Sequence, residues 1–440
     1  MSNPARVFCA LILCFALPAH SSARDAEEVF AKANTYTVRI DVSISTAFIE
    51  DRRGAGHGAG FLVDRERRWV MTNAHVAGHS PSVLEVTTKD GSRIGARKVY
   101  VDPYIDVAII ELEEDVLSLK EASLDCPQRP GTGHPVGAYG HPWGLNFTGT
   151  QGVISGSTEK WGATKLQTDT PINGGNSGGP LISMKTGRVI GINTSSVDDE
   201  NDQNTNFAVP IGQTCRILSL LRDGIDPSPP QKAFDFYDTI EENNELIVAR
   251  SFLTSKDIQL QEGDEVIAVG NNPVSNESEL FHWLRGTLDD VHLKVRRDGE
   301  LIELNGQITP EPNIVDRQGV LFSGVLFAMA PFQDKNALET GVDIMVHDIE
   351  RGSEGHSAKI HSYDFVVRVD GSPVHNLEHL RQLLMSGSQS SGEVQIDFLR
   401  IAEYFDSGRL FESVRRNVKW TPPKDIGSWP SETTAAKQND

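Results

Sequence analysis

Cysteine is scarce in this sequence, with four residues among 440. A framework of disulfides is therefore excluded, and stability has to come from ordinary packed cores. Cys9 and Cys14 lie in an N-terminal segment that we predict, as described next, to be removed as a signal peptide. Cys126 and Cys215 are then left as a possible disulfide. The sequence alone does not show whether these two meet.

Long hydrophobic runs are also missing. A membrane-spanning helix needs about 20 apolar residues, and the apolar runs of this sequence are shorter. Residues 1–23 carry one positive charge, a short apolar run from Val7 to Leu17, and small residues before Ala23. This pattern predicts a signal peptide cleaved near Ala23, and hence a periplasmic or secreted protein without a stable membrane anchor. An uncleaved anchor and lipid attachment at Cys14 are alternatives. The short run argues against the first, and the bulky Leu13 argues against the second.

Positive charge is in short supply, with 41 Lys and Arg against 61 Asp and Glu and a formal net charge of −20. No Lys/Arg block offsets this excess, so we expect no nucleic acid or anionic lipid as a partner. There is no G-x-x-x-x-G-K-[ST] loop either, which argues against energy from nucleotide hydrolysis. The histidine pairs lack the spacing and third ligand of a zinc site, and we expect no metal and no other cofactor.

Short runs rich in Val, Ile and Thr fill the chain between residues 38 and 208. Strands at this spacing favour a barrel or sandwich. The predicted strands are Tyr36–Ser45, Gly60–Val63, Trp69–Thr72, Val83–Thr88, Val107–Leu112, Gly152–Ser155 and Val189–Asn193. Apolar residues at helical spacing predict a closing helix over 210–222, and the Pro-rich stretch 226–230 then separates domains.

Two later segments, 263–274 and 362–374, resemble one another. Each predicts a strand and a tight turn ending in Pro-Val, followed by a helix over 278–284 or 377–384. This indicates a duplicated module of domain size rather than a solenoid. Residues 423–440 are nearly devoid of apolar side chains and predict a disordered tail.

A catalytic constellation is indicated by three separate motifs. Gly-flanked Ser177 lies in a tight turn where the amides of Gly175 and Ser177 can converge as an oxyanion hole. A serine hydroxyl needs a base, which His75 supplies, and Asp106 at the head of an apolar strand can orient that histidine. The chain order His, Asp, Ser is that of chymotrypsin-type proteases.

These residues resemble the HtrA (Deg) family of trypsin-like serine proteases. Its T-N-x-H-V and G-N-S-G-G-P patterns stand here as Thr72–Val76 and Gly175–Pro180. The similarity continues through Gly58–Phe61, Thr168–Asn173, Gly187–Thr194 and Phe207–Pro210. The resemblance implies a mainly β fold, with a chymotrypsin-like double β-barrel protease domain over 24–222. Two α+β PDZ-like domains are expected to follow, a divergent one over 226–312 and a second over 318–422.

The resemblance also implies an activity. It predicts an ATP-independent serine endopeptidase that degrades unfolded or damaged envelope or secreted proteins through an acyl-enzyme on His75, Asp106 and Ser177. A homo-oligomer, a trimer or multiple of trimers, is expected. The alternative is a chaperone or peptide-binding protein whose protease domain serves mainly as a scaffold, and the intact triad favours the protease.

Two substrate-binding regions are predicted on the same basis. In the second PDZ-like domain, Ser323 and the residues after it resemble the loop that holds a peptide's C-terminal carboxylate. The residues expected to form this loop are Gly324, Val325, Leu326 and Phe327. The first domain has no such loop near 234–245. In the protease, Pro171 stands where trypsin-like enzymes place a specificity charge, so we expect small-to-medium aliphatic side chains to be preferred. The residues expected near the pocket are Ile172, Ile192, Asn193 and Thr194.

Overall fold

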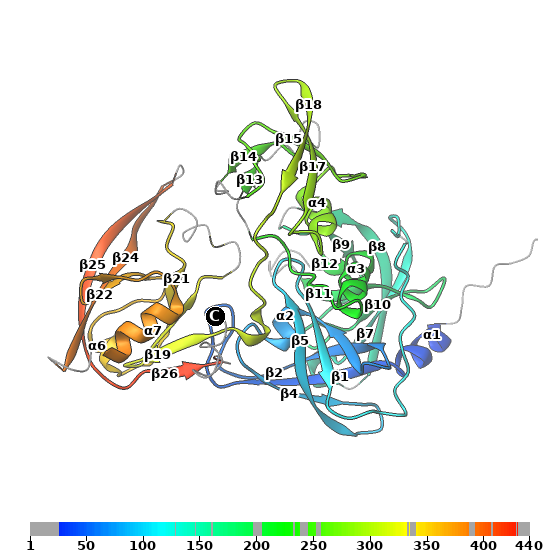
Figure 1. Ribbon diagram of the computed structural model, residues 1–440. Coiled ribbons are helices and arrows are strands. Elements are labelled where there is room, and N and C mark those ends of the chain that lie inside the picture. The colour runs from blue at the N-terminus through cyan, green and yellow to red at the C-terminus, as the bar shows by residue number, and fades with distance from the viewer. Residues whose placement is uncertain are drawn as a thin grey trace, which may run out of the picture.

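The computed structural model describes residues 26–127, 129–145, 147–159, 162–196, 205–231, 234–237, 245–251, 257–331, 334, 340–386, 392–405, 408–427 and 429. The predicted signal peptide lies outside these residues. No helix within them is long and apolar enough to span a bilayer. Figure 1 shows three lobes: a large one built on β1–β12, one around β13–β18, and one around β19–β26.

The first barrel is closed by six strands in the order β1-β2-β3-β6-β5-β4. They are β1 (Thr37–Ile44), β2 (Gly54–Asp64), β3 (Trp69–Thr72), β4 (Val83–Thr87), β5 (Arg93–Asp102) and β6 (Val107–Leu112). Alternation fills its interior: Val38 and Ile40 of β1 are fully buried, while Arg39 and Asp41 point outward and form an ion pair at 2.7 Å. Helix α1 (Ala26–Ala33) precedes the barrel, and α2 (Ala74–Ala77) follows β3.

A second barrel closes in the order β10-β11-β12-β9-β8-β7. Its strands are β7 (Pro135–Gly140), β8 (Thr148–Thr158), β9 (Lys165–Thr168), β10 (Pro180–Ser183), β11 (Val189–Ser196) and β12 (Asn206–Pro210), with the 3-10 turn η1 (Pro142–Gly144) between β7 and β8. The predicted closing helix is confirmed as α3 (Ile211–Arg222). The expected double β-barrel is therefore confirmed.

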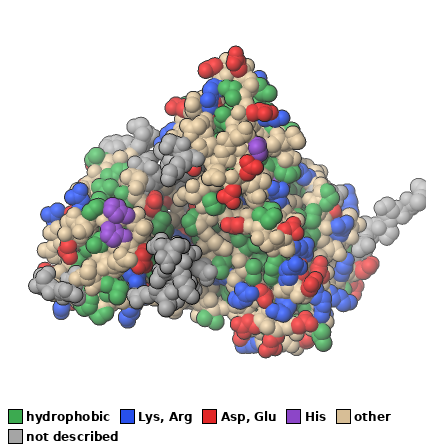
Figure 2. All heavy atoms as spheres, in the orientation of Figure 1, with side chains coloured by type: hydrophobic (Ala, Val, Ile, Leu, Met, Phe, Trp, Pro, Cys, Tyr) green, Lys and Arg blue, Asp and Glu red, His purple; other side chains and the backbone are tan. Residues whose placement is uncertain are grey.

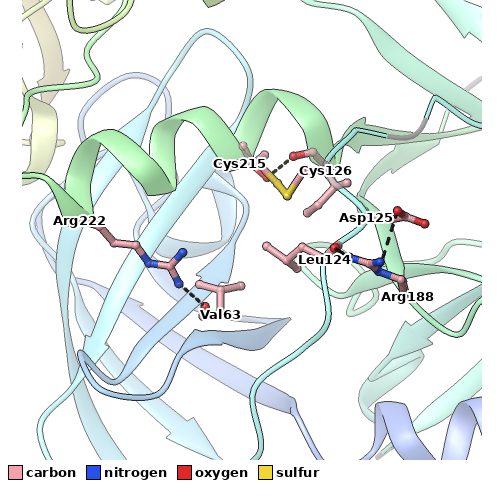
Figure 3. Close-up of a disulfide and its surroundings, with 9 residues drawn as sticks. Val63, Leu124, Asp125, Cys126, Arg188, Cys215 and Arg222 are labelled. Atoms are coloured by element: carbon pink, nitrogen blue, oxygen red, sulfur yellow. Dashed lines mark hydrogen bonds and ion pairs between the residues drawn. A yellow bond between two sulfur atoms is a disulfide. The ribbon is translucent and has the colours of Figure 1, made fainter.

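Cys126 and Cys215 form a disulfide, with 5.9 Å between their Cα atoms (Figure 3). It ties the segment ahead of the second barrel to α3. Nearby, Arg222 of α3 donates hydrogen bonds to the carbonyl of Val63 and to Asp64, at 2.9 and 2.7 Å. The helix is thus fixed covalently at one side and to the first barrel at its end.

Replacing Cys126 and Cys215 together by alanine is expected to lower the free energy of unfolding of the barrels by about 2–4 kcal/mol. The reason is that the bridge closes a loop of 89 residues and so restricts the unfolded chain. Urea unfolding of the full chain measures the change. A reductant should destabilise the unsubstituted chain and leave the variant unchanged; equal stability of the two oxidised proteins would contradict the prediction.

The described residues of the middle module form two small sheets and one helix. Strands β13 (Phe234–Phe236) and β14 (Val248–Ser251) pair with each other, and the larger sheet has the order β16-β15-β17-β18. These four strands are β15 (Glu265–Val269), β16 (Asn272–Pro273), β17 (Val291–Arg297) and β18 (Glu300–Gly306), and α4 (Glu277–Leu284) packs beside them.

The C-terminal module is an eight-stranded sheet in the order β25-β24-β22-β21-β20-β19-β26, with β23 paired to β22. Its strands are β19 (Gly319–Phe322), β20 (Val325–Met329), β21 (Ile344–Ile349), β22 (Phe365–Val369), β23 (Ser372–Pro373), β24 (Glu393–Phe405), β25 (Gly408–Lys419) and β26 (Lys424–Ile426). Among the described residues, its helices are α6 (Glu354–Ser357) and α7 (Leu377–Ser386). The 3-10 turn η2 (Ile314–Asp316) precedes the module and packs on the first barrel through Ile314 and Val315. The order β22, β23, α7 repeats that of β15, β16, α4, which confirms the duplication predicted from the sequence.

The prediction of a disordered tail over 423–440 is wrong for the first residues of that range. Residues 424–426 form β26, which pairs with β19. Main-chain pairing needs few apolar side chains, and low hydrophobicity therefore concealed the strand. On the outside, acidic and basic side chains are interspersed over the face drawn in Figure 2, as the composition leads one to expect.

Candidate active site

The structure brings His75, Asp106 and Ser177 to the junction of the two barrels. His75 lies on α2, which follows β3 of the first barrel, and Asp106 lies in the turn before β6. Ser177 lies in the loop before β10 of the second barrel. Thr194 of β11 contacts both of the latter residues: its hydroxyl donates to Asp106 Oδ2 at 2.6 Å, and its carbonyl accepts from Ser177 Oγ at 2.7 Å.

Asp106 holds the imidazole of His75 in a fixed position. Nδ1 of His75 lies 2.9 Å from Oδ2 and 3.0 Å from Oδ1, and the His75 amide also donates to Oδ1 at 3.0 Å. Asp106 itself has a φ of 59°, in the left-handed region, which is costly for a residue other than glycine. The amide side chain of Asn73 donates to the Asp106 carbonyl at 2.8 Å and stabilises this turn. Nδ1 is engaged, so Nε2 is the nitrogen left for proton transfer.

The two groups shift each other's pKa. Burial alone would raise the pKa of Asp106, but the charge and hydrogen bonds of His75, with the hydroxyl of Thr194, hold that pKa below its usual range. Burial alone would lower the pKa of His75, but the carboxylate of Asp106 outweighs it and raises that pKa above 6.5. Asp106 therefore stays ionised and stabilises a protonated His75.

This raised pKa of His75 predicts the pH dependence of any reaction that uses it as a base. A base must be unprotonated, so kcat/KM should fall as the pH drops through the pKa of His75, and that fall should begin above the ordinary value of 6.5. Hydrolysis of a peptide ester measured from pH 5 to pH 9 tests this. An acid limb centred below 6.5 would contradict it.

The hydroxyl of Ser177 points to Thr194 in this structure. It donates to the Thr194 carbonyl at 2.7 Å, and among the described residues no hydrogen bond joins it to His75. The hydroxyl must therefore leave the Thr194 carbonyl before His75 can take its proton. Nucleophile, base and orienting acid are neighbours, but only the base and the acid are already bonded.

The loop around Ser177 depends on glycine. Gly175 has a φ of 104°, and a Cβ there would lie 2.1 Å from the carbonyl oxygen of His141. Gly178 has a φ of 83°, and a Cβ there would meet the Thr72 hydroxyl at 2.1 Å. Within the part of the chain that the structure describes, the amides of Gly175 and Ser177 donate no hydrogen bond. Their role as an oxyanion hole stays a prediction.

The residues predicted near a specificity pocket lie in or against the interior of the second barrel. Ile172 and Ile192 are 5% and 0% exposed and belong to hydrophobic cores. Asn193 is also fully buried and donates to the Pro180 carbonyl at 3.2 Å. Thr194 contacts Ser177 and Asp106, as described above. The reason is that both faces of β11 are covered at this point, a feature that strand alternation in the sequence does not report.

The predicted carboxylate loop of the C-terminal module is a tight hairpin turn. Ser323 and Gly324 have φ values of 51° and 79° and connect β19 directly to β20. Strand β20 pairs with β19 on one side and with β21 on the other. A peptide strand cannot add beside Val325, Leu326 and Phe327, because they have no free edge.

Sequence reasoning missed a residue that shapes the Asp106 turn. Asp102 accepts hydrogen bonds from the amides of Tyr104 and Ile105, each at 3.0 Å. It also forms an ion pair with Arg285 of the middle module at 2.5 Å, and neither side chain is more than 2% exposed. The only signal in the sequence was a second aspartate four positions before Asp106. The partner, 183 residues away in the chain, carried none.

Comparison with known families identifies one part of the chain. Residues 58–192 match the family model of the trypsin-like peptidase domain. The match spans His75, Asp106 and Ser177.

Several known proteins are similar over much greater lengths. The periplasmic serine endoprotease DegP of Escherichia coli (strain K12) is 25% identical over 352 residues, which cover 75% of this chain and 72% of DegP. A probable periplasmic serine endoprotease DegP-like of Chlamydia trachomatis serovar D is 29% identical over 375 residues, covering 78% and 72%. A solved structure of the HtrA-type protease AlgW with a tripeptide superposes with a TM-score of 0.52 at 21% identity, over 65% of this chain and 97% of AlgW, and supports the fold.

Proposed function

This chain belongs to the HtrA (Deg) family of trypsin-like serine proteases, and we propose that it is an ATP-independent endopeptidase of unfolded or damaged proteins. The observation that supports this most is the bonded pair of His75 and Asp106 beside Ser177. A protein that only binds peptides has no use for a carboxylate that raises the pKa of a half-exposed histidine.

The proposed reaction is acyl transfer. Ser177 Oγ attacks the carbonyl carbon of the scissile bond while its proton passes to Nε2 of His75, and Asp106 stabilises the imidazolium that forms. The amides of Gly175 and Ser177 donate to the oxyanion, each contributing about 3–4 kcal/mol. Collapse of the tetrahedral intermediate transfers the proton from His75 to the leaving amine. Water then hydrolyses the acyl-enzyme by the same route in reverse.

We further propose a preference for small-to-medium aliphatic side chains before the cleaved bond. Pro171 places no charge at the position where a Lys/Arg specificity pocket needs one. A library of peptides varied at that position tests the preference. Efficient cleavage after lysine or arginine would contradict the proposed aliphatic preference.

Location and assembly complete the proposal. The relatives named periplasmic support a periplasmic or secreted place of action, with residues 1–23 removed near Ala23. We propose a protease domain over 24–222, PDZ-like modules over 226–312 and 318–422, and a homo-oligomer built from trimers. Sedimentation of the mature chain tests the last point, since a monomer at micromolar concentration would contradict it.

The matched substrates for the main test are one protein in two states. Native lysozyme and reduced, carboxymethylated lysozyme are incubated with the full chain in buffer without nucleotide. The proposal predicts fragments from the unfolded form only, with no increase on adding ATP. If neither form is cut but the chain suppresses aggregation of the unfolded one, the protein is a binding protein and the proposal is wrong.

A further inference from the structure

Strand β26 is the last strand at one edge of the C-terminal sheet, next to β19. It runs antiparallel to β19, with Gly319 opposite Ile426, Val320 opposite Asp425, and Leu321 opposite Lys424. Figure 1 shows β26 at the end of the sheet, alongside β19. Addition of a short extended segment to an open sheet edge is a standard mode of peptide recognition. The segment is the chain's own, but its main-chain pairing is that of a bound peptide.

Helix α7 holds the other side of this segment. Arg381 of α7 donates from Nε and Nη2 to the two carboxylate oxygens of Asp425, at 2.7 and 3.0 Å. The guanidinium also lies 5.2 Å from the ring centre of Trp429, and the indole N–H of Trp429 donates to the Ile426 carbonyl at 3.1 Å. A bidentate arginine–carboxylate pair fixes direction as well as position. The segment is therefore read by side chains as well as by the strand.

The contact reads an internal sequence rather than a chain terminus. Gly427 has a φ of 78°, and a Cβ there would lie 2.2 Å from the Arg317 carbonyl oxygen, so only glycine fits at this point. The chain continues beyond it to Trp429, so no terminal carboxylate takes part. This distinguishes the site from the carboxylate loop expected at Ser323–Phe327.

The segment also joins the module to the first barrel. Ile426 packs against a buried cluster of Phe48, Leu326 and Ala328, and Phe48 belongs to the loop after β1. The amide of Phe48 in turn donates to the hydroxyl of Ser80, just beyond α2, at 2.8 Å. Occupancy of the site is therefore physically connected to the protease barrel.

Only three residue pairs hold β26 to β19, and the Asp425 side chain is 37% exposed. Such a short edge strand can be exchanged for another. We propose that the groove between β19 and α7 is a binding site for extended internal peptide segments, and that residues 424–427 with Trp429 are its built-in ligand. The competing ligand would carry an acidic side chain opposite Arg381, followed by an aliphatic residue, glycine and, two positions later, an aromatic residue.

The test uses full-length chains that carry Ser177→Ala, so that no probe is cleaved and the outcome does not depend on protease activity. The probe is a fluorescein-labelled peptide with the sequence of residues 421–432, followed by fluorescence anisotropy. Asp425→Arg should release the built-in segment and make the chain bind the probe about tenfold more tightly than the chain with the unsubstituted tail. Lys424→Glu, on the same strand but outside the pair with Arg381, is the matched control and should not change the affinity.

Two further variants exclude a general loosening of the module. Arg381→Asp should bind a probe with arginine at position 425 and not the original probe. Joining Leu321→Cys to Lys424→Cys by a disulfide in the Asp425→Arg chain should abolish probe binding. Any of three results would overturn the proposal. They are equal affinity of the Asp425→Arg chain and the chain with the unsubstituted tail for the probe, binding of the original probe by Arg381→Asp, and undiminished binding by the cross-linked chain.

Discussion

Replacement of Ser177 by alanine is expected to lower kcat for a peptide ester by about 10⁶-fold and to leave KM within a few-fold of its original value. The variant loses the attacking oxygen, whereas the amides of Gly175 and Ser177 and the rest of the substrate-binding surface remain. The Ser177 hydroxyl donates only to the Thr194 carbonyl, so its removal should leave the fold intact.

Steady-state hydrolysis measured at several ester concentrations separates the two constants. Ser123→Ala is the matched control, because this serine is exposed and lies in a loop before the second barrel. Its activity should be unchanged. A Ser177→Ala protein with more than about one hundredth of the original kcat would show that another group is the nucleophile.

Replacement of Asp106 by asparagine is expected to lower kcat by about 10⁴-fold at neutral pH. The carboxylate accepts from Nδ1 of His75 at 2.9 Å and from the Thr194 hydroxyl at 2.6 Å. An amide group has one donating end, which favours the wrong tautomer of His75, and it has no charge to stabilise the imidazolium. Since the pKa of His75 is raised by Asp106, the acid limb of the residual activity should also move to lower pH.

A pH profile of kcat/KM for both proteins measures the two effects together. Asp290→Asn is a suitable control, because this carboxylate is 84% exposed and belongs to the middle module. A loss smaller than about tenfold, with the acid limb unmoved, would mean that Asp106 does not orient the base.

Local patterns in the sequence were enough to predict most strands and the three motif residues, whereas the choice of a double barrel over a sandwich came from the family resemblance. The alternation of apolar and polar residues in β1 and the nearly continuous apolar run of β6 are local patterns. Both can be recognised in the sequence without a structure. The Gly-flanked turn at Ser177 could also be predicted from nearby residues. Gly175 and Gly178 have positive φ angles, and glycine adopts this backbone conformation most easily.

What the sequence could not predict depends on contacts between distant segments. The ion pair of Asp102 with Arg285 joins two domains, and no local pattern couples these positions. Ile172 and Ile192 are buried in the barrel core, a packing that the sequence did not show. Strand β26 is polar and short, and it exists because β19 offers a free edge, which only the assembled sheet reveals.

Covalent trapping can show directly whether Ser177 is the nucleophile. The full chain is incubated with a peptidyl phosphonate that carries a small aliphatic side chain, under conditions in which it degrades unfolded lysozyme, and the adduct is located by mass spectrometry. We expect one phosphonate group per chain, on Ser177, and none after His75→Ala. Degradation of unfolded lysozyme that continues undiminished with no adduct on Ser177 would contradict it.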